Sequence, residues 1–292
     1  MAKHKYAMDE ARIAEFIRQG RGTGAGRNYL PWLTIQDVPS EGRVHRPLGW
    51  KTGRVHHFLS DVEFRHFLLF EWEEGVTDIR EGFPLNREKT LAIAEESGIP
   101  HPKDPRTNTP IVMTSDFLVI AGARTRRRPI AFAIKPAIKL EDDRVIEKLE
   151  IERRYQEQAG VDWYISTERE LPEGKVQALD WMHSYYDLRD IIEPYPGYTR
   201  DSISRFLTVL DTNASNDKPL ATACAELDEA HNTQEGTYLM IARHLLARKV
   251  IVTDMDRKSI WNVPVCDLSI DETASSRLHR QFDVSQHFDD AA

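Results

Sequence analysis

Hydrophobic positions in the first 170 residues follow two different periods, which predict helices and strands in a mixed order. Residues 60–75 (SDVEFRHFLLFEWEEG) and 141–160 (EDDRVIEKLEIERRYQEQAG) have apolar side chains at helical spacing. Four shorter stretches are predicted as strands, the last of them buried: residues 76–85, 111–122, 129–137 and 161–167. The order helix, three strands, helix, strand predicts an α/β layer with a mixed sheet.

The segment before residue 60 has a weaker pattern. Residues 8–19 (MDEARIAEFIRQ) are predicted as a short amphipathic helix, which the glycines of residues 20–27 (GRGTGAGR) end. This glycine-rich stretch lacks the Gly-Lys-Ser/Thr ending of a P-loop and follows no strand, so it predicts no nucleotide site. We expect a flexible, basic linker there.

The pattern becomes mostly helical beyond residues 171–175 (LPEGK), where we place a domain boundary. Helices are expected over residues 199–211, 218–231 and 233–248. KVIVTD (249–254) and SIWNVPV (259–265), joined by a turn, predict a hairpin. The expected domains are therefore residues 1–170 and a winged-helix-like module at 171–292, whose tail from about residue 272 should be poorly ordered without a partner.

Composition and charge narrow the class of protein. The chain has 292 residues, a net charge of -8 and two cysteines, Cys224 and Cys266, so we expect no disulfide framework. Its apolar runs are too short to span a membrane, and a cytoplasmic protein is expected. Residues 1–60 hold ten Lys/Arg against five Asp/Glu. This basic arm is either a phosphate-tracking surface or a solvated segment.

Asp116 and Lys135 are the first candidates for chemistry. Each lies in an apolar strand, and a short turn joins the two strands, so both side chains should meet at one end of the sheet. A carboxylate there can bind Mg²⁺, and a lysine can steady the charge that develops on a phosphate. A structural ion pair between the two residues is the alternative.

Glu63 is the third candidate. It shares a helix face with Phe67 and Phe70, and that face should pack on the sheet near Asp116. Ser60 precedes Glu63 by three residues, however, which is the spacing of a capping box. The sequence leaves capping and metal binding open.

Two further groups of residues are weaker candidates. Glu152 stands beside Lys148 and Tyr155 on the long helix, so a solvated or locally paired glutamate is expected by default. The turn between the two strands carries basic side chains that either contact DNA phosphates or are simply solvated: Arg124, Arg126, Arg127 and Arg128.

The order of Glu63, Asp116 and Lys135 on helix, strand and strand is similar to that of restriction-endonuclease-like nucleases. Longer stretches resemble the TnsA family, the endonuclease subunits of heteromeric bacterial cut-and-paste transposases. These stretches are RGTGAGRNYLPWLTIQDVPSEGRVHR, KTGRVHHFLSDVE, DIREGFPL, TSDFLVI, IKPA and EKLEIERRY. The resemblance runs from about residue 10 to residue 170, and only the helix-rich plan is similar beyond it.

The resemblance implies a restriction-endonuclease-like first domain that uses Mg²⁺, or Mn²⁺ in its place, to cut the non-transferred strand at the 5′ ends of a transposon. Glu63, Asp116 and Lys135 fall on the family's catalytic positions, and Glu152 on a helix glutamate near them. The partners implied are transposon-end DNA, the DDE-type recombinase TnsB and the AAA+ ATPase TnsC, the last through the C-terminal domain.

One position departs from the family pattern. An acidic or amide residue usually stands two positions before the lysine, but this chain has Ala133 there. Since alanine cannot bind a metal or water, a further ligand must come from the backbone or elsewhere. A stand-alone restriction or repair nuclease and a catalytically inert transposition adaptor therefore remain alternatives.

Overall fold

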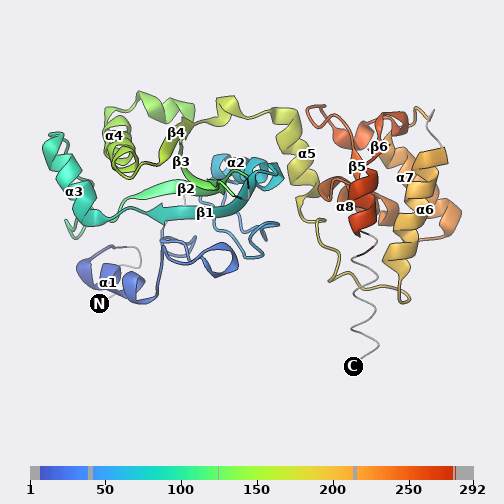
Figure 1. Ribbon diagram of the computed structural model, residues 1–292, viewed down its shortest axis with the longest axis horizontal. Coiled ribbons are helices and arrows are strands. Elements are labelled where there is room, and N and C mark those ends of the chain that lie inside the picture. Colours follow the sequence, from blue (N-terminus) through green and yellow to red (C-terminus); the bar gives the residue numbers. More distant parts are fainter. Residues whose placement is uncertain (1–6, 39–41, 124, 213–215, 279, 281–292) are drawn as a thin grey trace. The chain divides into compact units, whose positions relative to one another are not determined.

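A computed structural model describes residues 7–38, 42–123, 125–212, 216–278 and 280, which fold into the helices and strands of Figure 1. The chain divides into two compact units, Met1–Leu171 and Pro172–Ala292. No helix in the described ranges has the length and apolar character needed to cross a bilayer. We describe each unit in turn.

The first unit contains a four-stranded mixed sheet, so the predicted α/β class is confirmed. Its strands are β1 (Val76–Pro84), β2 (Thr114–Ala121), β3 (Arg128–Ile134) and β4 (Asp162–Ser166), in the spatial order β1-β2-β3-β4. β2 runs antiparallel to its two neighbours, β1 and β3, and β4 runs parallel to β3. The prediction that β4 is buried was wrong: it lies at the sheet edge, and Tyr164 is 51% exposed.

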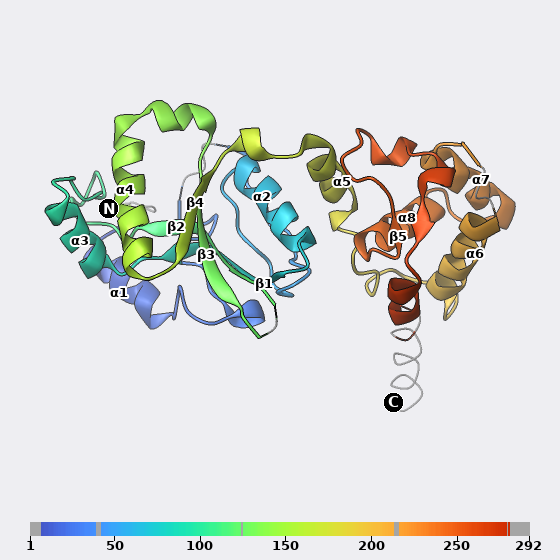
Figure 2. The same cartoon turned by 45° about the horizontal axis from the view of Figure 1, so that its top comes forward.

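Helices α2 (Asp61–Trp72) and α4 (Asp143–Gln158) cover opposite faces of this sheet (Figure 2). The ring of Phe70 in α2 packs against the rings of Phe117 and Phe132. On β4, Tyr164 packs on Phe132, whereas the adjacent Trp163 donates its indole N–H to a side chain of α4. Because neighbouring strand residues point to opposite faces, the two helices lie on different sides.

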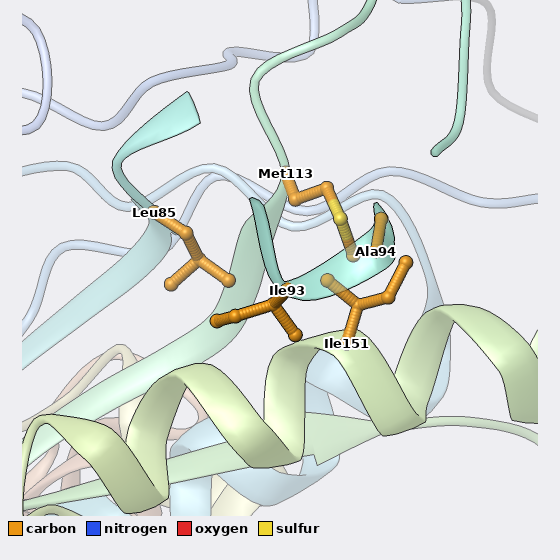
Figure 3. Close-up of a cluster of buried hydrophobic side chains, with 5 residues drawn as sticks. All are labelled: Leu85, Ile93, Ala94, Met113 and Ile151. Atoms are coloured by element: carbon orange, nitrogen blue, oxygen red, sulfur yellow. The ribbon is translucent and has the colours of Figure 1, made fainter. Parts of the chain in front are cut away.

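The sequence pattern did not predict helix α3 (Arg87–Glu96), which has few apolar residues. Its buried face nevertheless joins the cluster of Figure 3, made of Leu85, Ile93, Ala94, Met113 and Ile151. Ile93 and Ala94 come from α3 and Ile151 from α4. The cluster therefore attaches α3 to α4 and to the chain segments beside β1 and β2.

The N-terminal segment packs against the sheet. Helix α1 (Glu10–Arg18) precedes the glycine-rich stretch, whose prediction as a linker was wrong. The Gly22 N–H donates to Leu30 O at 2.6 Å, and the Trp32 N–H donates to Gly82 O of β1 at 3.2 Å. Gly24 has φ +90°, and a Cβ there would lie 2.2 Å from the carbonyl oxygen of Asn28. The glycines are needed for a closely packed loop.

A two-stranded segment follows this loop. Residues 43–58, here called the ribbon, form two extended stretches joined by a turn at residues 49–53. Antiparallel bridges pair His45 with Phe58 and Leu48 with Val55. The ribbon leads directly into α2.

The second unit is mainly helical, as predicted. It contains α5 (Glu173–His183), α6 (Tyr198–Thr212), α7 (Leu220–His231) and α8 (Thr237–Ala247), of which the pattern missed α5. The expected hairpin was wrong, because β5 (Ile251–Val252) pairs with β6 (Ser269–Ile270). Pro264 interrupts the stretch expected to pair, and two 3₁₀ helices take up or follow this stretch, Ile260–Asn262 and Val265–Asp267.

The tail expected to be poorly ordered begins with a helix. Residues 272–278 are helical, with Ala274 and Leu278 buried, so that part of the prediction was wrong. Two apolar side chains spaced four residues apart are enough to pack one side of this short helix. The rest of the expected tail, residue 279 and residues 281–292, lies outside the described residues.

Candidate active site

The sheet opens at the point where Asp116 and Lys135 meet. The last ladder pair between β2 and β3 joins Phe117 with Phe132. Beyond it, the N–H of Ile134 donates to Asp116 Oδ2 at 2.6 Å. The next N–H, that of Lys135, donates to Ser166 O at 3.1 Å, so β3 stays paired with β4. The two antiparallel strands therefore separate here, and the Asp116 carboxylate accepts the hydrogen bond that closes the gap.

Lys135 completes this arrangement. Its Nζ lies 2.5 Å from Asp116 Oδ2 and 3.1 Å from Ile134 O. Burial lowers the pKa of Lys135, but the attraction of the Asp116 carboxylate outweighs burial and leaves that pKa above its usual range. The two side chains are 30% and 20% exposed, so solvent reaches the ion pair. The lysine is a protonated cation at an accessible carboxylate.

Glu63 is both a helix cap and a neighbour of this ion pair. Its carboxylate accepts hydrogen bonds from the Leu59 N–H and the Ser60 hydroxyl, each at 3.0 Å. Ser60 in turn accepts the N–H of Glu63 at 3.3 Å. Burial and the nearby charge of Asp116 raise the pKa of Glu63 to about 7. Capping and proximity to Asp116 are therefore compatible.

Glu152 approaches the same site from α4, and the default expectation of a solvated or locally paired glutamate was wrong. The side chain is buried and accepts the Trp163 indole N–H at 3.0 Å. Burial and the charge of Asp116 raise the pKa of Glu152 to about 7. The reason is the helix face: Glu152 lies on the buried stripe that Leu149 and Gln156 define, at spacings of three and four residues.

The donor set is suited to a small, hard cation. Both hydrogen bonds that Asp116 accepts from described residues end on Oδ2, so Oδ1 is available as a ligand. Glu63 and Asp116 repel each other, and a divalent cation between them would relieve that repulsion. Within the described ranges, no three His, Cys, Asp or Glu side chains are grouped so that they could hold a metal ion by themselves. Mg²⁺ is usually bound in this way, by one or two carboxylates, with water and phosphate oxygens as its remaining ligands.

His66 and Ser166 support the site, and sequence reasoning missed both. His66 lies one turn after Glu63 in α2, and its Nδ1 lies 2.8 Å from Val62 O. Burial lowers the pKa of His66, so the ring is neutral and Nδ1 carries the proton that the carbonyl accepts. Nε2 then accepts the hydroxyl proton of Ser166 at 2.8 Å. Only the position of His66 on the Glu63 helix hinted at this contact.

Comparisons with known proteins identify the family. Residues 73–168 match the family model for the TnsA-like endonuclease N terminal, and residues 170–255 match that for the TnsA endonuclease C terminal. The chain is 39% identical over 251 residues to the transposon Tn7 transposition protein TnsA of Escherichia coli, covering 86% of this chain and 88% of that protein. The chain belongs to the TnsA family of transposon endonucleases.

In this TnsA-family chain, the basic turn between β2 and β3 lies away from the ion pair. Asp116 is near the start of β2, whereas the turn follows Ala121, so about five residues, or ~17 Å of strand, separate them. Arg126, Arg127 and Arg128 are exposed there, and Arg128 pairs with Asp162 at 2.8 Å. Arg124 lies outside the described residues. Their contact with DNA stays a prediction.

Proposed function

We propose that this chain hydrolyses DNA phosphodiester bonds at the 5′ ends of a transposon, on the non-transferred strand, in a Mg²⁺-dependent reaction. The observation that carries the proposal is the 2.5 Å contact between Lys135 Nζ and Asp116 Oδ2 at the open end of the sheet, with Glu63 close enough for its pKa to rise. Membership of a family of transposon endonucleases supports the choice of DNA as substrate.

Asp116 and Glu63 are the residues that would hold the cation. Asp116 offers Oδ1, and Glu63 offers a carboxylate that its helix cap orients. A bound Mg²⁺ would supply Lewis acidity toward the phosphate and toward the attacking water, and Mn²⁺ would do the same with similar oxygen ligands. Glu152, buried beside them, adds negative charge that favours cation binding.

Lys135 acts on the phosphate. Its ammonium group is protonated at neutral pH and already lies at the mouth of the site, where the side chain is 30% exposed. When the phosphate is present, one of its three N–H donors can leave Asp116 for a phosphate oxygen. The lysine ammonium group then stabilises the negative charge that grows on the phosphate oxygens as the attacking water forms its bond to phosphorus.

The proposed assembly follows from the resemblance to transposition proteins. In it, a DDE-type recombinase (TnsB) cuts and joins the 3′ ends, and an AAA+ ATPase (TnsC) regulates both activities and contacts the C-terminal unit of this chain. The reaction would take place in the bacterial cytoplasm, where the transposon DNA is located. Helices α5–α8 are the described part of the chain that would meet the ATPase.

A strand-specific cleavage assay on transposon ends, with the recombinase and ATPase present, tests the proposal. Asp116→Asn and Lys135→Ala should abolish 5′ cleavage and leave 3′ cleavage by the recombinase in place. Asparagine keeps an oxygen acceptor for the Ile134 N–H, which protects the fold. Asp162→Asn, an exposed acid paired with Arg128 at the other end of β3, is the matched control. Cleavage by Asp116→Asn at the wild-type rate contradicts the proposal.

The same assay separates the two alternatives. A stand-alone nuclease would cut DNA with Mg²⁺ when both partners are omitted. An inert adaptor would support 3′ cleavage while the wild-type chain cuts no 5′ end. Ala133, fully buried and without a side-chain oxygen, is the observation that supports an inert adaptor.

A further inference from the structure

The ribbon concentrates positive charge on a chain that is negative overall. Residues 42–60 include four Lys/Arg and no Asp or Glu, although the whole chain carries a net charge of -8. Arg43 and Arg46 are exposed, and neither forms an ion pair with a described residue. Arg27 adds a further guanidinium, since its Nε donates to Gly53 O in the ribbon turn at 3.3 Å.

Buried contacts fix the ribbon to the sheet. Arg54 donates through both terminal nitrogens to the two carboxylate oxygens of Glu81, at 2.7 and 2.5 Å. His56 Nδ1 lies 2.9 Å from the same carboxylate. Glu81 belongs to β1 and pairs across the sheet with Phe117, the residue next to Asp116. The ribbon is thus held in a defined place relative to the strand that carries the catalytic aspartate.

Both ends of the ribbon contact the start of α2, where Glu63 lies. His45 Nε2 is 2.6 Å from Asp61 Oδ1, and the His45 ring stacks on Phe64 with ring centroids 4.2 Å apart. At the other end, the N–H of Leu59, which directly follows the ribbon, donates to the Glu63 carboxylate. A molecule lying on the ribbon therefore also lies beside the candidate active site.

The outward face of the ribbon combines apolar side chains with a guanidinium. Strand alternation places Val44, Arg46 and Leu48 on one side, and Val55 is the cross-strand partner of Leu48. Val44, Leu48 and Val55 are 38%, 55% and 40% exposed. Exposed apolar groups beside Arg43 and Arg46, two exposed guanidinium groups that form no ion pair with a described residue, match a groove wall lined by phosphates better than a protein surface.

We propose that the ribbon binds duplex DNA beside the scissile phosphate. Arg43 and Arg46 contact phosphates, and the face with Leu48 and Val55 lies against the groove, into which a two-stranded ribbon fits. This inference rests on the proposed function in one respect, that DNA is the substrate. It adds the element that holds the duplex in place over Glu63 and Asp116.

Salt-dependent DNA binding tests the ribbon. The full-length chain is titrated against a fluorescent transposon-end duplex in EDTA at several salt concentrations, so that no cleavage can occur. Arg43→Ala and Arg46→Ala should each weaken binding and reduce the slope of log affinity against log salt by about 1. Arg18→Ala removes a 74% exposed guanidinium from α1 and should leave the slope unchanged.

Three outcomes would overturn the ribbon proposal. The first is a wild-type chain that binds no duplex even at low ionic strength, and the second is an unchanged slope in the double Arg43→Ala, Arg46→Ala variant. The third is that Leu48→Ser with Val55→Ser abolishes binding to the recombinase while DNA binding stays at the wild-type level, which would make this face a protein interface.

The experiments distinguish a failure of the ribbon proposal from a failure of the proposed nuclease function. Duplex binding is measured in EDTA, where no cleavage occurs, so the result for the arginine variants does not depend on whether the chain cuts DNA. If the arginine variants lose DNA affinity but the wild type never cuts 5′ ends, the ribbon proposal stands and the nuclease proposal fails. If the wild type cuts 5′ ends but the arginine variants keep the wild-type salt slope, the nuclease proposal stands and the ribbon proposal fails.

Discussion

The imidazole of His66 and the hydroxyl of Ser166 lie 2.8 Å apart, although 100 residues separate them in the chain. Ser166 also accepts the backbone N–H of Lys135 through its carbonyl oxygen. The contact thus joins the helix that carries Glu63 to the strand that pairs with the backbone of Lys135. We expect His66 to help position Lys135 by acting through Ser166.

Removing the Ser166 hydroxyl should loosen this connection. Ser166→Ala leaves His66 Nε2 buried without a donor, which costs about 1–3 kcal/mol of unfolding free energy. We expect a severalfold lower rate of 5′ cleavage at saturating DNA, with DNA affinity unchanged, because Lys135 is less well placed. Ser166→Thr retains a hydroxyl and should restore most of the rate. Urea denaturation and single-turnover cleavage measure both effects, and a Thr variant as slow as the Ala variant would contradict a positioning role.

Glu152 should make the metal-free protein less stable as the pH rises. Its pKa is about 7 in the folded state and about 4.5 when unfolded, so the folded state binds the proton more tightly. Unfolding free energy therefore falls between about pH 4.5 and pH 7, and Glu152→Gln removes this loss. We expect Glu152→Gln to be more stable than the wild type by up to ~3 kcal/mol at pH 8, but not at pH 4. Thermal denaturation in EDTA across this pH range checks it.

Mg²⁺ binding should strengthen as the pH rises through about 7. The proton on Glu63 competes with the cation, because the pKa of this carboxyl is raised to about 7. Calorimetric titration of the Asp162→Asn control with Mg²⁺ should show a higher affinity at pH 8 than at pH 6. Glu63→Gln should bind more weakly, with a smaller change between the two pH values. A pH-independent affinity in the control protein would exclude Glu63 as a ligand.

The buried pair of Arg54 and Glu81 should be sensitive to the loss of one partner. The arginine and His56 keep the pKa of Glu81 down at about 2 despite burial, so the carboxylate is charged at neutral pH. Arg54→Met leaves that charge poorly compensated and should cost about 3–5 kcal/mol of unfolding free energy. Adding Glu81→Gln should recover much of the loss. A double variant that is less stable than Arg54→Met would contradict this account.

Local patterns were sufficient to predict much of the first unit. Asp116 and Lys135 were predicted to meet because strand alternation and a short connecting turn leave few alternatives, and the structure places them 2.5 Å apart. The capping box at Ser60 and the approach of Glu63 to Asp116 were both predicted, and they coexist. The four-stranded mixed sheet followed from the order of the periodic segments.

What was missed depends on contacts between distant parts of the chain. Glu152 looks solvated when it is compared with Lys148 and Tyr155, and only the packed α4 shows that its stripe faces the sheet. The link from His66 to Ser166 has no local signature, since a serine at the end of a strand is common. The glycines at residues 20–26 look like a linker until Pro84 and Asn28 are seen against them.

The hydrogen bond from the Ile134 N–H to Asp116 has a consequence for how this protein can evolve. The carboxylate proposed to hold the metal also completes the seam between β2 and β3, so loss of its oxygen leaves a backbone donor unpaired. Relatives that abandon DNA cleavage can discard Glu63 and Lys135 without opening this seam. We therefore expect inactive descendants that retain the sheet to keep aspartate or asparagine here, as a remnant of the lost reaction.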